Sequence, residues 1–239
     1  MPRYCLVTGA NRGLGLAFTR QLLERGEHVI ASCRQPGKAT GLNTLAGEFP
    51  GRLHILPLDV ANQKSRLELV RELPLILGEP TDSEPRRIDL LINNAGVLHS
   101  GERFGHIDPA ILEDSFRINA IGPFMLGQAL APLLADGARI ANLSSVMGSL
   151  ERCSEFRSPS YCSSKAAQNM LTVELAHALR ARGIVVLALH PGWVQTDMGG
   201  SSATVDGADS ARGLLQVIEA ATLEDSGHFL DWRGQPLPW

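Results

Sequence analysis

Short apolar runs alternate with longer amphipathic segments along almost the whole chain, and this alternation is the feature that most constrains the fold. The runs are rich in Val, Ile and Leu without polar alternation, which is typical of strands covered by helices on both faces. Strands and helices that alternate in this way form a parallel, doubly wound α/β sheet. The expected strands are YCLVT (4–8), HVIASC (28–33), LHILPL (53–58), IDLLI (88–92), RIANLS (139–144), IVVLALH (184–190) and HFLDW (228–232).

The intervening segments predict helices, and nothing in the sequence divides the chain. There is no fixed-period repeat and no low-complexity tract. The polar stretch 78–87, which contains two prolines, is interpreted as a surface loop, and 199–210 is a second loop-like segment. We therefore expect a single domain over residues 1–239. The expected helices span 13–25, 40–48, 62–77, 109–135, 160–182 and 207–221.

Charge and cysteine content narrow the classes of function. A net charge of −3 and a pI near 6.2 give no reason to expect nucleic acid or an anionic membrane as a partner. No stretch approaches membrane-spanning length, and the N-terminal apolar run is too short for a signal peptide. The four cysteines lack CxxC spacing and histidine companions, so we expect free thiols, no metal site and a cytoplasmic location.

The first chemical motif is TGANRGLG (8–15), which follows the first expected strand. Glycines between a strand and a helix permit a tight turn and let backbone N–H groups approach a pyrophosphate at the helix N-terminus. A turn that needs glycine only for its geometry is the alternative. The motif follows the first strand of a βαβ series, and this position favours nucleotide binding.

The second motif is YCSSK (161–165), which contains one of two tyrosines and one of three lysines in the chain. Residues i and i+4 of a helix share a face, so Tyr161 and Lys165 can point into one cleft. A nearby cation favours the phenolate, so we expect Lys165 to lower the pKa of Tyr161 and suit it to acid/base catalysis. A surface lysine beside a packed tyrosine is the alternative, and for this motif alone the more common one.

The GxxxGxG spacing of the turn and five further ordered motifs resemble the short-chain dehydrogenase/reductase family over nearly the whole chain. The five are NNAG (93–96), INAIGPF (118–124), NLSSVMG (142–148), YCSSK and HPGWVQTDM (190–198). The resemblance implies a Rossmann-type fold and a small-molecule carbonyl or alcohol as substrate. The tail GHFLDWRGQPLPW (227–239) resembles a subgroup that includes C-factor-like proteins and sniffer-type carbonyl reductases.

The resemblance implies four catalytic residues: Asn119, Ser145, Tyr161 and Lys165. Tyr161 would be the proton donor, Lys165 would tune it and hold the cofactor ribose, and Ser145 would orient the substrate carbonyl. Only one of Ser144 and Ser145 can face the cleft, and a strand-end cap is the role we expect for Ser144. Asn119 would position a water beside Lys165, with buried hydrogen bonding to a neighbouring strand as the alternative.

The cofactor preference is predicted from the end of the second expected strand. NAD-dependent relatives usually carry a carboxylate there, whereas this chain has Cys33 followed by Arg34, and Arg12 lies in the glycine-rich turn. Two arginines suit a 2′-phosphate, so we expect NADP(H). Stacking of Arg34 on adenine and a solvated Arg12 are the alternatives. The expected cofactor-binding residues are Gly9, Asn11, Arg12, Gly13, Leu14, Gly15, Arg34, Asp59, Val60, Asn93, Ala95, Gly96, Tyr161, Lys165, Pro191, Gly192, Val194 and Thr196.

We therefore expect an NADP(H)-dependent carbonyl reductase that needs no metal. An NADP(H)-binding signalling or sensing protein with little turnover is a second hypothesis, and a nucleotide-sugar epimerase or dehydratase a third. The loop between Ser145 and Tyr161 is longer than is usual in the family and carries Arg152, Glu155 and Arg157. The resemblance also implies a homodimer or a dimer of dimers, although some relatives are monomers. Its contacts would come from Phe124, Leu126, Met170 and Leu171.

Overall fold

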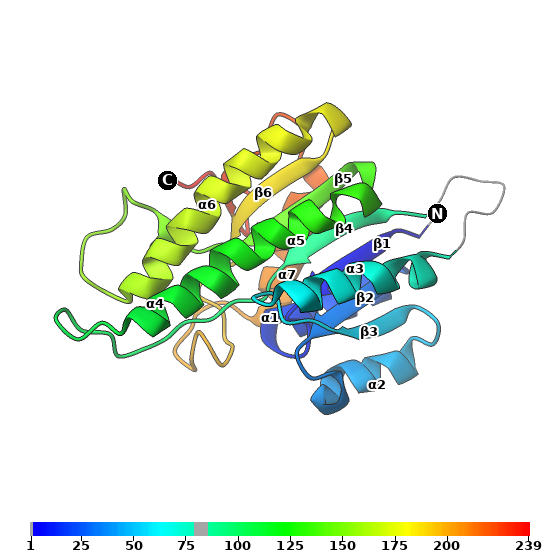
Figure 1. The fold of residues 1–239 in the computed structure, drawn as a ribbon, viewed down its shortest axis with the longest axis horizontal. Coiled ribbons are helices and arrows are strands. Elements are labelled where there is room, and N and C mark those ends of the chain that lie inside the picture. Colours follow the sequence, from blue (N-terminus) through cyan, green and yellow to red (C-terminus); the bar gives the residue numbers. More distant parts are fainter. Residues whose placement is uncertain (1, 79–85) are drawn as a thin grey trace.

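Seven parallel strands form one sheet in the computed structural model, which describes residues 2–78 and 86–239 (Figure 1). Their order across the sheet is β3-β2-β1-β4-β5-β6-β7. The predicted doubly wound α/β fold is therefore confirmed. The strands are β1 (Tyr4–Thr8), β2 (His28–Cys33), β3 (Leu53–Pro57), β4 (Ile88–Asn93), β5 (Leu134–Leu143), β6 (Val185–His190) and β7 (Phe229–Asp231).

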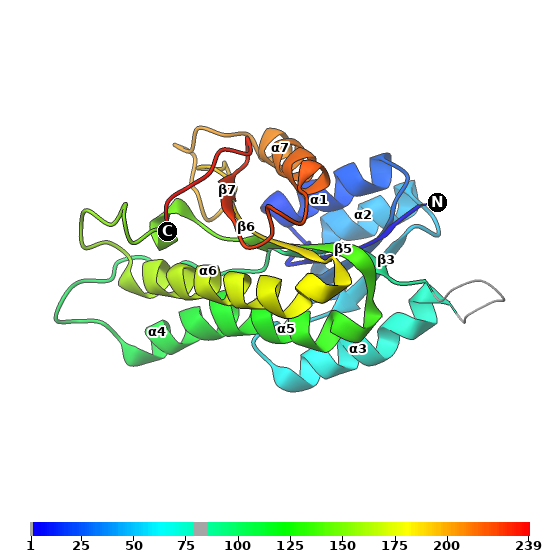
Figure 2. The same ribbon diagram turned by 90° about the horizontal axis from the view of Figure 1, so that it is seen from above.

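Helices cover both faces of this sheet, as the apolar strands require (Figure 2). One face packs against α1 (Gly13–Glu24), α2 (Thr40–Glu48) and α7 (Gly207–Ala220). The other packs against α3 (Gln63–Leu77), α5 (Gly122–Leu130) and α6 (Pro159–Leu179). Every residue of β1 is buried because both of its faces are covered. None of the helices in the described ranges is long and apolar enough to cross a membrane.

The strand order reverses between β1 and β4, and this reversal positions the site. From β1 the chain continues outward to β2 and β3, and then returns so that β4 pairs with the other side of β1. The connections on the two sides of such a point leave a crevice at the carboxyl ends of the strands. The motifs after β1, β4, β5 and β6 therefore meet at one edge of the sheet.

The predicted helix over 109–135 is an unbroken helical run from Pro109 to Leu133, and only its end is wrong. The structure has α4 (Pro109–Phe116), a π-helical turn η2 (Arg117–Ile121), α5, and a 3-10 turn η3 (Ala131–Leu133). Pro132 lacks the N–H that would continue the helix. The strand then begins at Leu134, five residues before the expected 139, since Leu134 pairs with Ile88 and is fully buried. The other predicted helices and strands begin and end close to the observed ones.

One residue expected on the outer face of these helices lies inside the protein. Leu126 is fully buried and packs in the core below the sheet with Leu130 and Leu175. It is therefore unavailable for a contact between subunits. Of the other three residues expected there, Phe124 and Leu171 are half-buried and Met170 is exposed.

Candidate active site

The glycine-rich turn after β1 is held against the end of β4. Asn94 donates from Nδ2 to the carbonyl oxygens of Thr8 and Gly9, at 2.9 and 3.0 Å. A Cβ at Gly15 would lie 2.3 Å from the Gly9 oxygen, so no side chain fits at this position. The sequence analysis did not include Asn94. The second amide of NNAG could have indicated it, because this segment passes next to the glycine-rich turn. The N–H of the expected residue beside it, Ala95, donates to the Thr8 hydroxyl oxygen at 3.0 Å.

Helix α1 begins at this turn with Arg12 as its N-cap residue, and no side chain of the described residues caps it. The first N–H groups of the helix are therefore free to bind an anion. Asn11 and Arg12 are exposed at the mouth of the turn, whereas Leu14 is buried in the core and supports it.

Arg12 bonds to a carboxylate from a distant segment. Its Nη1 lies 2.7 Å from Oδ2 of Asp197, and both side chains are largely exposed. A Cβ at Gly13 would lie 3.3 Å from Cγ2 of Thr196, so the segment after β6 touches the turn. The expected solvated or phosphate-binding Arg12 is thus ion-paired in the structure.

Basic side chains gather beside the end of β2. The Ala10 N–H donates to the Ser32 oxygen at 3.0 Å, which places the glycine-rich turn next to this strand end. Cys33 is buried, whereas Arg34 is exposed and forms no ion pair within residues 2–78 and 86–239. Lys38, which ends the short helix η1 (Pro36–Lys38), is also exposed. The sequence analysis did not include Lys38, because it considered only Cys33 and Arg34 at the end of this strand.

The expected pair Asp59 and Val60 follows β3. Asp59 is half-buried, and its Oδ1 accepts from the Ala61 N–H at 3.0 Å. Val60 is buried, and its oxygen would lie 2.9 Å from a Cβ at Gly122. This turn is therefore packed directly against the start of α5.

Asn93 is directed into the sheet. Its Nδ2 donates to Oδ1 of Asn142 at 2.8 Å, and Asn142 donates onward to the Thr172 hydroxyl at 2.9 Å. These contacts tie β4, β5 and α6 together below the crevice. The Nδ2 of Asn93 thus has a structural partner, whereas its buried Oδ1 accepts no hydrogen bond from the described residues.

Asn119 lies in the π-helical turn and is fully buried. Its Oδ1 accepts from the Val97 N–H at 2.8 Å, and its Nδ2 donates to the Val97 oxygen and to the Ser164 hydroxyl at 2.9 and 3.0 Å. Asn119 is therefore hydrogen-bonded in the interior, but to the segment after β4 and to α6 and not to a neighbouring strand as the alternative expected. Because both Nδ2 protons are used, the side chain of Asn119 positions its neighbours.

The two serines at the end of β5 point to different sides. The Ser144 hydroxyl donates to Oδ1 of Asn169 on α6 at 2.5 Å. The Ser145 oxygen accepts from the Met147 N–H at 3.1 Å, so the cap role expected for Ser144 belongs to Ser145. The hydroxyl of Ser145 keeps its proton to donate, either to the phenolic oxygen of Tyr161 or to a substrate.

Tyr161, in the first turn of α6, is buried and has Ser145 as its hydrogen-bonding neighbour. Burial raises the pKa of Tyr161 to about 12, and the side-chain hydrogen bond with Ser145 opposes this shift. The expected lowering of this pKa by Lys165 is not found: burial raises the pKa, and the Ser145 hydrogen bond is the one cause that lowers it. At neutral pH Tyr161 is a protonated donor.

Lys165 is buried one turn further along α6. Its Nζ donates to the Leu143 oxygen at 2.6 Å and to Oε1 of Gln168 at 2.9 Å, and lies 5.8 Å from the centre of the Tyr161 ring. Burial lowers the pKa of Lys165 to about 7. A Cβ at Gly96 would lie 3.8 Å from Nζ and 3.2 Å from Oδ1 of Asn119. The end of β4 therefore meets the tyrosine and lysine face of α6.

The segment after β6 folds back on itself beside the crevice. The Pro191 oxygen accepts from the Ser210 hydroxyl at 2.7 Å, and a Cβ at Gly192 would lie 3.1 Å from the Trp232 ring nitrogen. Val194 is buried and bridges Val205. These contacts hold Thr196 and Asp197 next to the glycine-rich turn.

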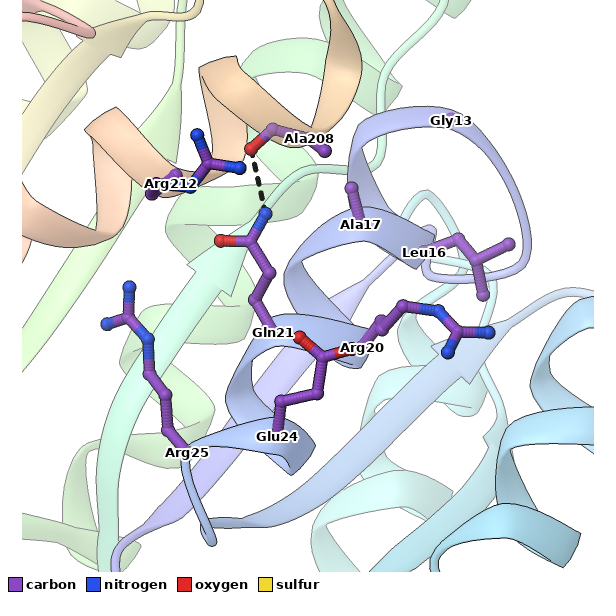
Figure 3. Close-up of a pocket in the computed structure, with 9 residues that line it drawn as sticks. All are labelled: Gly13, Leu16, Ala17, Arg20, Gln21, Glu24, Arg25, Ala208 and Arg212. Carbon is purple, nitrogen blue, oxygen red and sulfur yellow. Dashed lines mark hydrogen bonds between the residues drawn. The ribbon is translucent and has the colours of Figure 1, made fainter.

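Two cavities flank the crevice. One of about 260 Å³ lies between the longer loop after Ser145 and the start of α6, and it is lined by Val146, Met147, Ser149, Arg152, Cys153, Ser154, Glu155, Arg157 and Cys162. The other, of about 650 Å³, lies between α1 and α7 (Figure 3). Its Arg20, Arg25 and Arg212 are paired with Glu48, Glu219 and Asp209. Because these arginines are already ion-paired, the larger size of this cavity does not identify it as the reaction site.

Comparison with known proteins agrees with this geometry. Residues 3–206 match the family model for short chain dehydrogenases. The C-signal protein of Myxococcus xanthus is 45% identical over 154 residues, which cover 64% of this chain and 93% of that protein. An NADPH-bound carbonyl reductase from chicken fatty liver has a TM-score of 0.92 and 36% identity, covering 100% of this chain and 99% of that one. The carbonyl reductase Sniffer of D. melanogaster has a TM-score of 0.93 and 32% identity, with both chains covered in full (100%). This chain belongs to the short chain dehydrogenase family.

Proposed function

We propose that this protein is a single-domain, NADP(H)-dependent oxidoreductase that interconverts a carbonyl and an alcohol. The observation that carries the proposal is the buried cluster of Ser145, Tyr161 and Lys165 at the carboxyl end of β5. It offers a protonated phenol and a serine hydroxyl that can donate, at one place. The carbonyl reductases among its structural neighbours support the same reaction class. The four free thiols fit a reducing, cytoplasmic location.

The residues that would hold the cofactor fit its charged parts. The uncapped start of α1 suits the pyrophosphate, and Gly15 lets the helix pack closely against Gly9 and Asn94, which keeps the turn in shape. Arg34 and Lys38 suit a 2′-phosphate, which carries roughly two negative charges. Lys165 would bond the ribose, and Thr196 lies beside the turn. When bound, NADPH supplies the hydride.

The side chains of the cluster would then do the rest of the chemistry. Tyr161 donates its phenolic proton to the carbonyl oxygen as the carbonyl is reduced. Ser145 donates a hydrogen bond to the same oxygen and stabilises the negative charge that develops there. Lys165 stabilises the phenolate that Tyr161 becomes. Asn119 positions the Val97 backbone and Ser164 around this cluster.

A sensing protein with little turnover is the second candidate. The relationship to the C-signal protein is the observation that favours it. The protonated Tyr161 beside a serine with a free proton favours catalysis, since binding of the cofactor alone does not require a proton donor. Turnover separates the two functions.

A screen of NADPH oxidation tests the proposal. Purified protein would be mixed with aldehydes, ketones, quinones and diketones, and the absorbance of NADPH followed. We expect at least one carbonyl to be reduced and Tyr161→Phe to lose about 10²- to 10⁴-fold in kcat while it still binds NADPH. Binding of NADPH with no turnover of any carbonyl class would favour the sensor, and near-normal rates in Tyr161→Phe would reject Tyr161 as the acid.

A further inference from the structure

Gln168 is a buried polar residue that the proposed mechanism does not use. It lies in α6, three residues after Lys165, and is 2% exposed. Its Oε1 accepts from Nζ of Lys165 at 2.9 Å. Because an ammonium only donates hydrogen bonds, the amide oxygen and not its nitrogen must face Nζ. The orientation of the amide is thus fixed by the lysine.

The ammonium of Lys165 has three protons, and the protein binds two of them. One goes to the Leu143 oxygen at 2.6 Å and one to Gln168. The remaining proton is left for the side of the crevice, where Gly96 and the Tyr161 ring lie close to Nζ. Two fixed acceptors therefore determine the direction of the third donor.

The partner that Gln168 supplies is neutral. Tyr161 is the titratable group that faces Lys165 from its own helix. From β5, β6, η2 and the 3-10 turn η4 (Val146–Gly148), no charged side chain in the described ranges shifts the pKa of Lys165, which burial alone lowers. A carboxylate at position 168 would pair with the ammonium and cancel its field at Tyr161. An amide accepts the hydrogen bond without doing so.

We propose that Gln168 is a positioning residue, which holds the Lys165 ammonium by one hydrogen bond and leaves its charge uncompensated for Tyr161 and the cofactor ribose. This inference rests on the proposed function for the roles of Tyr161 and Lys165. The hydrogen bond itself can be tested without turnover. If Gln168 only packed in the core, its substitution would leave the pKa of Lys165 unchanged.

The chain is well suited to a direct measurement, since Lys38, Lys64 and Lys165 are its only lysines. Protein labelled with ¹⁵N-lysine gives one Nζ signal for each, and exposed Lys38 and Lys64 provide internal references. The Nζ signal of Lys165 would be followed from pH 5 to pH 10 in wild type, Gln168→Met, Gln168→Glu and the matched control Gln128→Met. Gln128 is an exposed glutamine on α5.

We expect the two substitutions to move the pKa of Lys165 in opposite directions. Gln168→Glu adds an anion at hydrogen-bond distance and raises it by about one unit or more, whereas Gln168→Met removes an acceptor of the charged form and lowers it. Gln128→Met leaves it unchanged. Either variant decides the matter if the other does not fold. A Lys165 titration that is the same in wild type and in each folded variant overturns the proposal.

Kinetics separate this inference from the proposed function. If Tyr161 and Lys165 act as proposed, Gln168→Met raises the KM for NADPH, and Gln168→Glu moves the alkaline limb of the kcat profile to higher pH, because Tyr161 loses the field of a free ammonium. A shifted Lys165 titration with an inactive wild type would support the hydrogen bond and reject the catalytic roles. Opposite shifts with unchanged kinetics in an active enzyme would overturn the positioning role.

Discussion

The guanidinium of Arg12, in the glycine-rich turn, lies 2.7 Å from the carboxylate of Asp197, in the segment after β6. This ion pair joins two parts of the crevice that are 185 residues apart in the chain. An exposed pair of this kind contributes about 0–1 kcal/mol, so a phosphate that offers stronger bonds can displace the carboxylate. Arg12 would therefore bind a 2′-phosphate only in competition with Asp197, whereas Arg34 has no such competitor among the described residues.

Arg34→Ala should therefore weaken NADPH binding more than Arg12→Ala. Loss of a hydrogen bond to a charged group costs about 1.5–3 kcal/mol, or roughly 10- to 100-fold in affinity, and NADH should lose little in either variant. The measurement is kcat/KM and Kd for both cofactors. Arg71→Ala, at an exposed position on α3, is the matched control. Equal use of the two cofactors by wild type would return NAD to consideration.

Substitution of the two serines should separate catalysis from stability. Ser145→Ala removes a donor to the substrate oxygen and should lower kcat by about 10²- to 10³-fold. Ser144→Ala leaves the buried Oδ1 of Asn169 without its donor at 2.5 Å, so we expect about 1–3 kcal/mol of lost stability and a smaller change in kcat. Urea unfolding and steady-state kinetics on both variants check this. If Ser144→Ala lost activity and Ser145→Ala lost stability instead, Ser144 would be the serine that faces the cleft.

Lys165 should make stability depend on pH in a defined direction. Its pKa falls from 10.5 to about 7 on burial, so between these values the unfolded chain binds the extra proton. Stability then rises with pH, by at most about 1.4 kcal/mol per unit from this group. The free energy of unfolding of wild type, relative to Lys165→Met, should therefore increase from pH 7 to pH 9. Urea titrations at each pH measure it, and a constant difference would contradict the lowered pKa of Lys165.

A homodimer through α5 and α6 remains a prediction, now with a revised surface. Leu126 is buried, whereas Met170 on α6 is 61% exposed and Ile121, just before α5, is 48% exposed. Met170→Glu should convert a dimer to a monomer, because an unpaired charge in an interface is costly. Light scattering at micromolar concentration measures the mass. Leu75→Glu, at a position on α3 that is 84% exposed, should change nothing. A monomeric wild type would remove the dimer hypothesis.

The sequence alone determined the order of the elements and the residues gathered at the crevice. Buried parallel strands require unbroken apolar runs, so β1, β2 and β6 can be read directly from the sequence. Strand ends in a doubly wound sheet meet at one edge, so motifs after β1, β4 and β5 had to converge. The spacing of Tyr161 and Lys165 fixed their common helix face in the same way. These are local properties of the chain.

Only the tertiary structure decided the partners and the charge states. Leu134 is in a strand because Ile88 lies beside it, and Leu126 is buried because Leu175 covers it. The pKa of Tyr161 is raised because burial outweighs the effect of its neighbours. Asp197 reaches Arg12 from 185 residues away in the chain, and the Leu143 oxygen reaches Lys165 from β5. Desolvation and pairing depend on every atom around a group, and these atoms come from segments far apart in the sequence.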